Sequence, residues 1–246
     1  MLLQILTYTH HLTTMLFGIF LSAFFLGVKQ NKKNVCILLG GGAVSGLFFL
    51  ICNTVFGSLF TEAVYPIFVH LPLFLLLVFY YRFRWLPSII SIMTAYLCCQ
   101  FSNWAGIFAL SLSGLEWVYY LVRIIVTVAV LAFLSRYLCQ TTALLLAKSD
   151  RELYILGAMP FVYYVFDYST TKFSMLLYSG NKVVVEFLAF AMCISYVIFL
   201  FVYFQEYELK NRAEQYGQLT NMQLNSLHSE IEQIRSSEHR MKILRH

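Results

Sequence analysis

Charged residues are scarce in this sequence. Asp, Glu, Lys and Arg together make up 12% of its 246 residues, whereas hydrophobic residues make up 60% and the mean hydropathy is +0.72. Soluble domains carry roughly 25% charged residues and about 45–50% apolar ones. A soluble core has too little interior for so much apolar surface. The composition therefore excludes an ordinary soluble domain and predicts an integral membrane protein.

Motifs that bind nucleotides or metals, or that cleave bonds, are also lacking. The sequence contains no GxxxxGK[ST], GxGxxG, HExxH or GxSxG motif. Its six cysteines form no CxxC pair, so they are expected to be apolar packing residues. His10 and His11 have no acidic or Cys partner nearby, and no metal site is predicted there. The chain by itself is expected neither to be an enzyme nor to hold a cofactor, and no nucleic-acid partner is expected.

Long apolar stretches occupy most of the chain. Seven of them are long enough to cross about 30 Å of hydrocarbon at ~1.5 Å per residue. They are Leu3–Val28, Val35–Phe56, Tyr65–Tyr81, Leu86–Leu110, Val118–Leu134, Asp150–Tyr168 and Val183–Tyr207. The first has no basic region before it and is too long for a cleavable signal peptide, so it is expected to be a span. The predicted fold is all-α: a polytopic membrane bundle over residues 1–203, followed by a cytoplasmic helix over residues 204–246.

Basic residues are distributed unequally between alternate loops. Eight lie in one set of loops and two in the other: Lys29, Lys32, Lys33, Arg82, Arg84, Arg136, Lys148 and Arg151 against Lys172 and Lys182. Because short loops rich in Lys and Arg stay in the cytoplasm, the first set is predicted to be cytoplasmic. In the cell membrane, the N-terminus is then on the outer side and the C-terminus is in the cytoplasm.

Local signals support individual helices. Ser149-Asp150-Arg151-Glu152 is typical of a capping box, in which Ser149 accepts from the Glu152 amide and Glu152 reaches back. Gly42 and Gly46 are four residues apart and are expected to allow close contact between helices.

From Gln205 onward the composition changes sharply. Acidic and basic residues balance, and apolar residues recur in steps of three, four, three and seven. They are Leu224, Leu227, Ile231, Ile234 and Met241. This is a heptad pattern, and it predicts a parallel homodimeric coiled coil with these residues at the interface. A plain solvated helix is the alternative.

Polar side chains within the predicted spans gather toward one side of the membrane. On the predicted topology seven lie in the outer halves of their helices: Asn53, His70, Gln100, Asn103, Arg123, Asp167 and Glu186. Charges within a span cost ~2.5–3.5 kcal/mol at its centre and usually face the bundle interior. We therefore expect these residues to bind a ligand in a cavity that is open to the outside. The alternatives, that Asp167 and Glu186 lie among headgroups and that Arg123 snorkels, stay open.

The final residues, Met241-Lys242-Ile243-Leu244-Arg245-His246, end the heptad helix. They resemble the entry to the phosphoacceptor box of the peptide-sensing, GHKL-type sensor histidine kinases of Gram-positive bacteria. In that family a multi-span membrane sensor continues into a dimerisation helix with an apolar-Arg-His-Asp motif. Leu244-Arg245-His246 matches the first part of this motif. The following Asp and the ATP-binding domain are not in the sequence.

This resemblance implies that His246 is the phosphoacceptor and that ATP and Mg²⁺ serve a domain that follows it. It also implies an extracellular ligand such as a peptide and a cytoplasmic response regulator as partner. The expected function is a membrane sensor of a two-component system. The alternatives are a transporter or channel subunit with a helical tail, and a membrane anchor that only dimerises. A proton or ion pathway would need polar groups in the inner half of the bundle as well, where mostly hydroxyls occur, for example at Ser88, Ser91 and Ser195.

Overall fold

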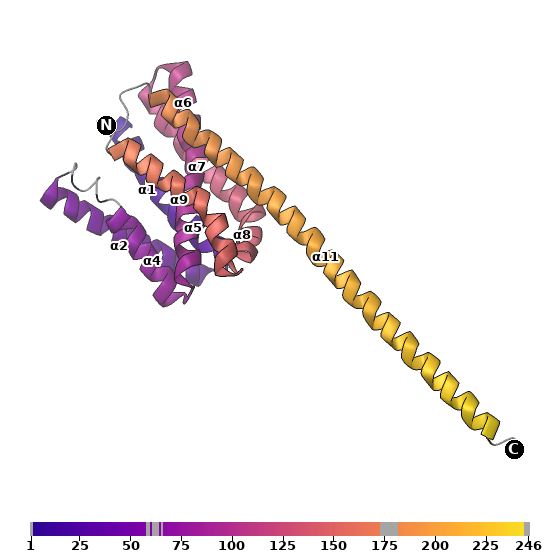
Figure 1. Cartoon of the computed structure of the whole chain (residues 1–246). Helices are drawn as coiled ribbons and strands as arrows, with labels where there is room; N and C mark the ends of the chain where they lie inside the picture. The colour runs from indigo at the N-terminus through magenta and orange to yellow at the C-terminus, as the bar shows by residue number, and fades with distance from the viewer. Residues whose placement is uncertain (1, 58–59, 61–63, 65, 173–181, 244–246) are drawn as a thin grey trace. The chain divides into compact units, whose positions relative to one another are not determined.

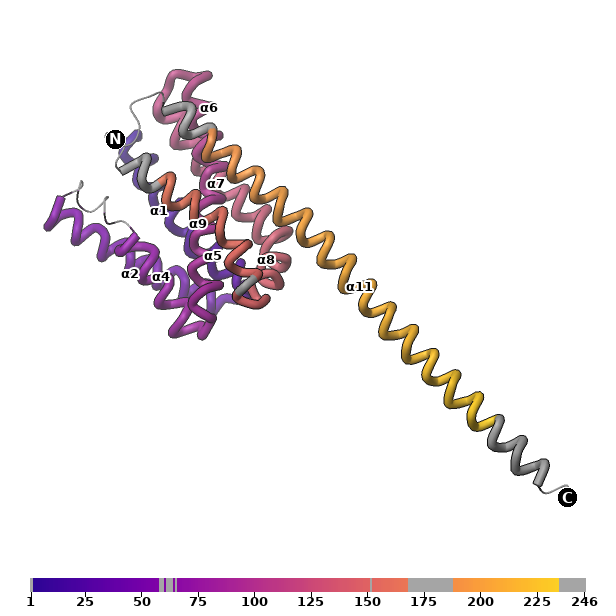
Figure 2. Tube along the Cα trace, viewed as in Figure 1, coloured from indigo at the N-terminus to yellow at the C-terminus, as the bar shows by residue number. Residues whose placement is uncertain are grey.

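The computed structural model describes residues 2–57, 60, 64, 66–172 and 182–243, and the side chains of residues 151, 168–172, 182–187 and 235–243 are outside this description. All regular structure in the described part is helical, as predicted (Figure 1, Figure 2). In chain order the elements are α1 (Leu2–Phe25), α2 (Lys32–Phe56), the π-helix η1 (Pro66–His70), α4 (Leu71–Leu75), the π-helix η2 (Leu76–Tyr80), α5 (Trp85–Cys98), α6 (Gln100–Ser113), α7 (Glu116–Tyr137), α8 (Cys139–Leu146), α9 (Asp150–Lys172) and α11 (Lys182–Ile243).

Four helical segments of the described chain are long and apolar enough to cross a membrane, and the chain is therefore a membrane protein. They are Lys32–Phe56, Trp85–Ser113, Glu116–Tyr137 and the Leu188–Ile234 part of α11. The other three predicted stretches are helical too, but they do not meet the same criteria. Pro66–Tyr80 is shorter, α1 contains several threonines and the His10–His11 pair, and α9 contains charged residues.

The predicted span Leu86–Leu110 is not a single uninterrupted helix. It divides at Cys99, whose amide donates to the carbonyl of Tyr96 at 3.1 Å and so closes a tighter turn. The chain then continues as α6, with Asn103 donating to the Cys99 carbonyl at 3.2 Å. The predicted membrane-spanning stretch is confirmed, since Trp85–Ser113 is long and apolar enough to cross a membrane, but hydropathy carries no signal for the change of hydrogen-bond pattern at Cys99.

Helix α1 is central to the bundle. It packs against α2, α5, α7 and α8, while α6 packs against α7 and α5 against α9. The second half of α1 is almost entirely buried, including Phe17, Leu21 and Phe25. Segments far apart in the sequence therefore surround one helix, and side chains from all of them can face a common interior.

Glycine residues lie at two of these helix contacts, α1 with α2 and α5 with α9. A Cβ atom on Gly42 would lie 3.0 Å from Ile19 Cδ1, and one on Gly46 would lie 3.5 Å from Met15 Cε, so the contact predicted for these two glycines is confirmed against α1. A Cβ on Gly157 of α9 would lie 2.7 Å from Ile90 Cγ1 of α5. That distance is too short for a real contact, so α5 and α9 approach as closely as they do because residue 157 has no side chain.

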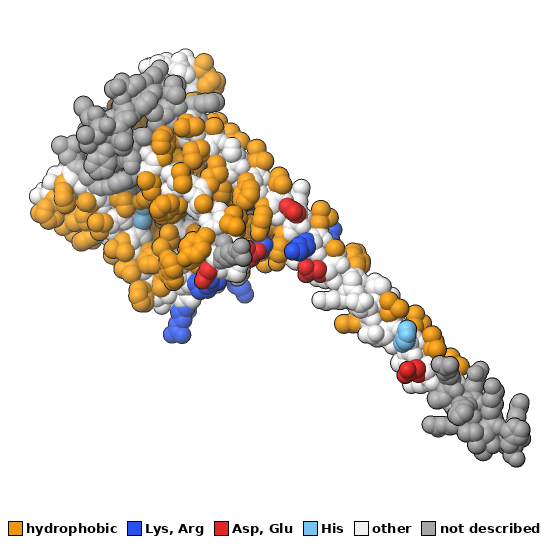
Figure 3. All heavy atoms as spheres, in the orientation of Figure 1, with side chains coloured by type: hydrophobic (Ala, Val, Ile, Leu, Met, Phe, Trp, Pro, Cys, Tyr) orange, Lys and Arg blue, Asp and Glu red, His pale blue; other side chains and the backbone are white. Residues whose placement is uncertain are grey.

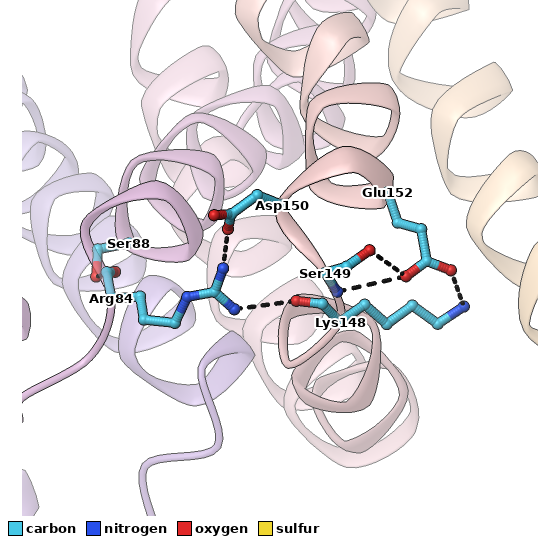
Figure 4. Close-up of polar contacts among 6 residues, drawn as sticks. All are labelled: Arg84, Ser88, Lys148, Ser149, Asp150 and Glu152. Carbon is cyan, nitrogen blue, oxygen red and sulfur yellow. Dashed lines mark hydrogen bonds and ion pairs between the residues drawn. The ribbon is translucent and has the colours of Figure 1, made fainter.

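The three basic loops meet at the same end of the bundle. Lys29 and Arg136 line one groove, between the end of α1 and the start of α8. Arg84 donates from Nη1 to the carbonyl of Lys148 at 3.0 Å and forms an ion pair with Asp150 (Figure 4). On the face drawn in Figure 3, Lys and Arg side chains gather near one edge of the bundle and hydrophobic side chains cover most of the rest. This placement agrees with loops that share one side of a membrane.

The predicted capping box is present in part. The Glu152 carboxylate accepts from the Ser149 hydroxyl at 2.9 Å and from its amide at 3.4 Å (Figure 4). The Lys148 ammonium adds an ion pair to the same carboxylate at 3.3 Å. Glu152 thus reaches back as expected, whereas Ser149 uses its hydroxyl on this carboxylate rather than accepting from the Glu152 amide.

Contacts divide the chain into two units, Met1–Ile198 and Phe199–His246, and α11 contributes to both. Within the first unit, the Phe190 ring of α11 packs against Trp104 of α6 at 5.3 Å between centroids. The Tyr196 hydroxyl donates to the Leu156 carbonyl of α9 at 3.1 Å. The start of α11 is therefore part of the bundle. In the second unit the described side chains are almost all exposed.

Candidate ligand-binding cavity

A cavity of about 260 Å³ lies inside the first unit, and it is lined from six parts of the chain. These are α1, η1 with α4, α5 with the Cys99 turn, α6, α7 and α9. The lining residues are Thr14, Met15, Gly18, Ile19, Ser22, Val69, His70, Leu73, Ile92, Tyr96, Cys99, Gln100, Asn103, Arg123 and Asp167. One part of the lining is apolar and the other is polar, with one cationic and one anionic side chain.

Helical periodicity explains how these side chains reach the same space. On α1, Thr14, Gly18 and Ser22 recur every four residues and so share a face. Small and hydroxyl side chains on that face leave room that Leu or Phe would fill. Tyr96 and Gln100 are also four residues apart, on either side of the Cys99 turn, so the break in the helix keeps both on the cavity side.

A tyrosine–carboxylate network forms one wall. The Tyr96 hydroxyl donates to Asp167 Oδ2 at 2.6 Å, and Tyr163, one turn before Asp167 on α9, also hydrogen-bonds to that carboxyl group. Gln100 Nε2 donates to the Tyr163 hydroxyl, and Asn103 Nδ2 donates to Gln100 Oε1 at 3.3 Å. Asp167 is only 8% exposed. A buried carboxylate with two hydroxyl donors is a satisfied acceptor, which accounts for its presence inside an apolar bundle.

His70 extends this wall. Its Nδ1 lies 2.9 Å from the Tyr164 hydroxyl, and its ring meets that of Tyr96 edge-on at 5.8 Å between centroids. Tyr96 and Tyr164 are also in edge contact, at 5.0 Å. This aromatic packing holds the imidazole against α5 and α9, so η1 is attached to the helices that carry the network.

Arg123 of α7 supplies the positive charge. One of its guanidinium nitrogens donates to the hydroxyl of Tyr119, one turn earlier, and the guanidinium lies 5.0 Å from the centroid of the same ring. The aliphatic part of Arg123 lies against Gly106 of α6, where an added Cβ would be 2.8 Å from its Cδ. Arg123 therefore lies in a slot between α6 and α7 that exists because residue 106 is glycine.

Arg123 is not fully satisfied by the protein. Its Nε is buried and has no hydrogen-bond partner, and no carboxylate among the described residues forms an ion pair with it. Leaving a buried donor without a partner costs about 1–3 kcal/mol, and more for a charged group. Arg123 lines the cavity in spite of this cost.

Five of the seven residues predicted to bind a ligand line this one cavity: His70, Gln100, Asn103, Arg123 and Asp167. Asn53 does not. It lies near the end of α2, where its backbone carbonyl accepts from the Gly57 amide at 3.1 Å. Its neighbour Cys52 packs against Phe68 and Val69, so that turn of α2 presents an apolar side chain to the bundle. Position along the sequence could not show which way this turn of α2 faces.

Other predictions lie wholly or partly outside the described residues. The side chain of Glu186, in the first turns of α11, is one of these, as are His246 and the side chain of Met241. The four remaining heptad residues, Leu224, Leu227, Ile231 and Ile234, are described and are between 51% and 60% exposed.

Sequence reasoning missed several polar members of the site. Tyr96 and Tyr163 are the donors to Asp167, and each is four residues from a polar residue that was selected, Gln100 and Asp167. That spacing was a usable signal, because residues four apart share a helix face. His10 was considered only as a metal ligand. It is in fact buried, 3.3 Å from the Thr14 hydroxyl and beside Tyr120 of α7.

The lining of the cavity suits the binding of a small molecule. Among the described residues no three His, Cys, Asp or Glu side chains come together as metal ligands. The polar groups of the lining are hydrogen-bond donors and acceptors around a partly apolar space, which is the usual composition of a small-molecule site. Comparison with known proteins gives no match: no family model, curated protein or solved structure is similar to this chain.

Proposed function

We propose that the chain is the membrane sensor region of a two-component histidine kinase. It would detect an extracellular ligand in the cavity and transmit binding through α11. The observation that carries the proposal is that the polar cavity lies in the same bundle as the first part of a helix that continues to Ile243. A binding site and an output helix are thus linked through one set of packed helices.

The proposed topology has seven spans, with the N-terminus outside and the C-terminus in the cytoplasm. The eight basic residues in one set of loops support it, as does the meeting of those loops at one end of the bundle. In this topology α1, the segment Pro66–Tyr80 and α9 also cross the membrane, because the polar side chains with which they line the cavity do not face lipid. Reporter fusions after Lys33, Arg84 and Lys148 should be cytoplasmic, and one after Lys172 should be extracellular. An inverted result at two of these positions would exclude the topology.

Transmission would begin where α11 packs on the bundle. Phe190 contacts α6, which carries Gln100 and Asn103, and Tyr196 is hydrogen-bonded to α9, which carries Asp167. A ligand that favours one arrangement of α6 and α9 would therefore bias the position of α11, since a ligand acts through its different affinities for two states. Glu186 lies in the first turns of this helix, and we expect it to influence the response.

The output would be a dimer that phosphorylates a histidine. Four exposed apolar residues at heptad spacing support a parallel coiled coil, since a helix in water gains from covering such a stripe. The resemblance assigns phosphate acceptance to His246, with ATP and Mg²⁺ used by a domain beyond it. A response regulator would then take the phosphate.

The proposal requires a longer protein that includes an ATP-binding domain. It is tested by measuring the transfer of phosphate from ATP to that full-length protein. Radiolabel from ATP should be incorporated in the wild type and lost in His246→Gln. His239→Gln is the matched control, because it removes a histidine seven residues earlier in the sequence and should retain labelling. Labelling that survives His246→Gln would refute the assignment of His246, and a full-length protein without any ATP-dependent labelling would refute the kinase function.

A further inference from the structure

The cavity contains two charged side chains, Asp167 and Arg123, and they differ in the partners that the protein gives them. Asp167 already receives hydrogen bonds from the hydroxyls of Tyr96 and Tyr163. Arg123 has one hydrogen bond, to the neutral hydroxyl of Tyr119, and no ion pair with a described residue. The negative charge of the site therefore has its donors within the protein, whereas the positive charge has no anionic acceptor among the described residues.

The unused part of Arg123 is suited to an anion. A guanidinium group has five N–H donors in one plane, and Nε together with a terminal nitrogen matches the two oxygens of a carboxylate. Arg123 lines the cavity, and the protein uses one terminal nitrogen of its guanidinium group, on Tyr119, while Nε is enclosed without a partner. The slot at Gly106 prevents the side chain from relaxing toward α6, since the Arg123 stem fills that space.

The rest of the lining limits the form of the anion. Met15, Ile19, Val69, Leu73 and Ile92 form the apolar part of the cavity and favour an aliphatic group attached to the charge. Asp167 carries a negative charge in the same cavity and disfavours a second negative charge on the ligand. The volume of about 260 Å³ is slightly below the range of roughly 300–1,000 Å³ for sites of drug-sized molecules. It suits a small molecule or the end of a larger one.

We propose that the cavity binds a monoanionic carboxylate attached to a short aliphatic group, with Arg123 as the residue that holds the carboxylate and Gly106 as a positioning residue. The identification of this group as part of the extracellular signal rests on the proposed sensor function. Binding of the carboxylate itself does not depend on signalling.

The experiment uses the full chain in phosphatidylcholine nanodiscs and a matched pair of probes. N-acetyl-leucine carries the carboxylate and a branched aliphatic side chain, and N-acetyl-leucinamide has the same shape without the charge. Binding is measured as the rise in the unfolding midpoint with probe concentration, because a ligand of the folded state stabilises it. We expect the acid to raise the midpoint and to bind at least tenfold more tightly than the amide.

Variants separate the role of Arg123 from a general effect of charge. Arg123→Gln should weaken binding of the acid about tenfold or more, and Gly106→Ala should weaken it while retaining the charge, because the added methyl group displaces Arg123. Arg136→Gln is the control, since Arg136 is exposed on the same helix, and binding should be unchanged. Should Arg123→Gln not fold, Gly106→Ala and Arg123→Lys still test the proposal.

Three outcomes would overturn it: equal binding of acid and amide, no stabilisation by the acid, or unchanged binding in both Arg123→Gln and Gly106→Ala. A lipid source for the anion is tested by replacing half of the phosphatidylcholine with phosphatidylglycerol. Phosphatidylglycerol could raise the unfolding midpoint in an Arg123-dependent way while N-acetyl-leucine has no effect. That result would assign the site to a phosphodiester and refute the proposal. None of these readouts involves phosphorylation, so the proposed kinase function can fail independently.

Discussion

The two units of this chain arrange polar and apolar residues in opposite ways. In the bundle, the polar side chains of Gln100 and Asp167 are buried around the cavity, and many large apolar side chains are exposed. In the second unit, the charged side chains that the structure describes and the apolar residues Leu227 and Ile231 are all exposed. Each unit therefore exposes apolar surface of a different kind. The exposed apolar surface of the bundle requires lipid, whereas the narrow apolar stripe of the helix is the surface that the proposed coiled coil would cover.

The largest effect is expected from a charge placed on that stripe. Leu227→Asp would bury an unpaired carboxylate at the centre of the proposed coiled coil. We expect this to weaken the dimer by ~3 kcal/mol or more, over 100-fold in Kd. The measurement is the dimer fraction against protein concentration by light scattering in detergent. His228→Asp, one residue away and off the heptad seam, should leave the dimer intact. Equal losses in both variants would show that the stripe is not an interface.

The next effect tests the buried network of the bundle. Tyr96→Phe removes the hydroxyl that donates to Asp167 at 2.6 Å and leaves this buried carboxylate with fewer donors. The expected loss of stability is ~1.5–3 kcal/mol, measured from the unfolding midpoint in nanodiscs. Tyr80→Phe, which removes a hydroxyl from an exposed tyrosine, should have little effect. Similar midpoints for the two variants would mean that the Tyr96 hydrogen bond does not support the carboxylate.

A third change tests the close approach of α5 and α9. The Cβ of Gly157→Ala would meet Ile90 at 2.7 Å, and overpacking of this kind costs about 1–3 kcal/mol. Gly40→Ala is the matched control, because nothing lies within 4 Å of a Cβ at that helical position. Thermal unfolding of both variants measures the difference. If the clash is the cause, Ile90→Ala should restore part of the stability in the Gly157→Ala background.

The smallest effect is expected at the end of the bundle where the basic loops meet. Arg84 and Asp150 form an ion pair with side chains that are 49% and 61% exposed. Exposed pairs contribute about 0.2–1 kcal/mol and weaken with salt, so Arg84→Gln should lower the midpoint slightly, and less so at high salt. Arg82→Gln removes a charge from the same loop and serves as the control. A loss above ~2 kcal/mol would mean that Arg84 is more than a surface partner.

Part of the site was predictable because position along a span reports depth in the membrane. His70, Gln100, Asn103, Arg123 and Asp167 were selected on that basis, and all five line one cavity. Asn53 satisfied the same criterion and lies elsewhere, since depth does not report the direction in which a side chain points. Tyr96 and Tyr163 were missed because tyrosine is common at membrane interfaces and carries no charge to mark it as part of a site.

The sequence by itself determined that this is a helical membrane protein, because its charge is low and its apolar stretches have the length of spanning helices, which satisfy their own backbone hydrogen bonds in lipid. It also determined the exposed heptad stripe, since periodicity depends on local spacing alone. Only the tertiary structure decided that the helical hydrogen-bond pattern changes at Cys99 and that Gly106 makes a slot for Arg123. It also decided that Asp167 receives hydrogen bonds within the protein, while Arg123 has no anionic acceptor among the described residues. These features depend on how helices distant in the sequence rotate against one another, and hydropathy along a single chain does not record that rotation.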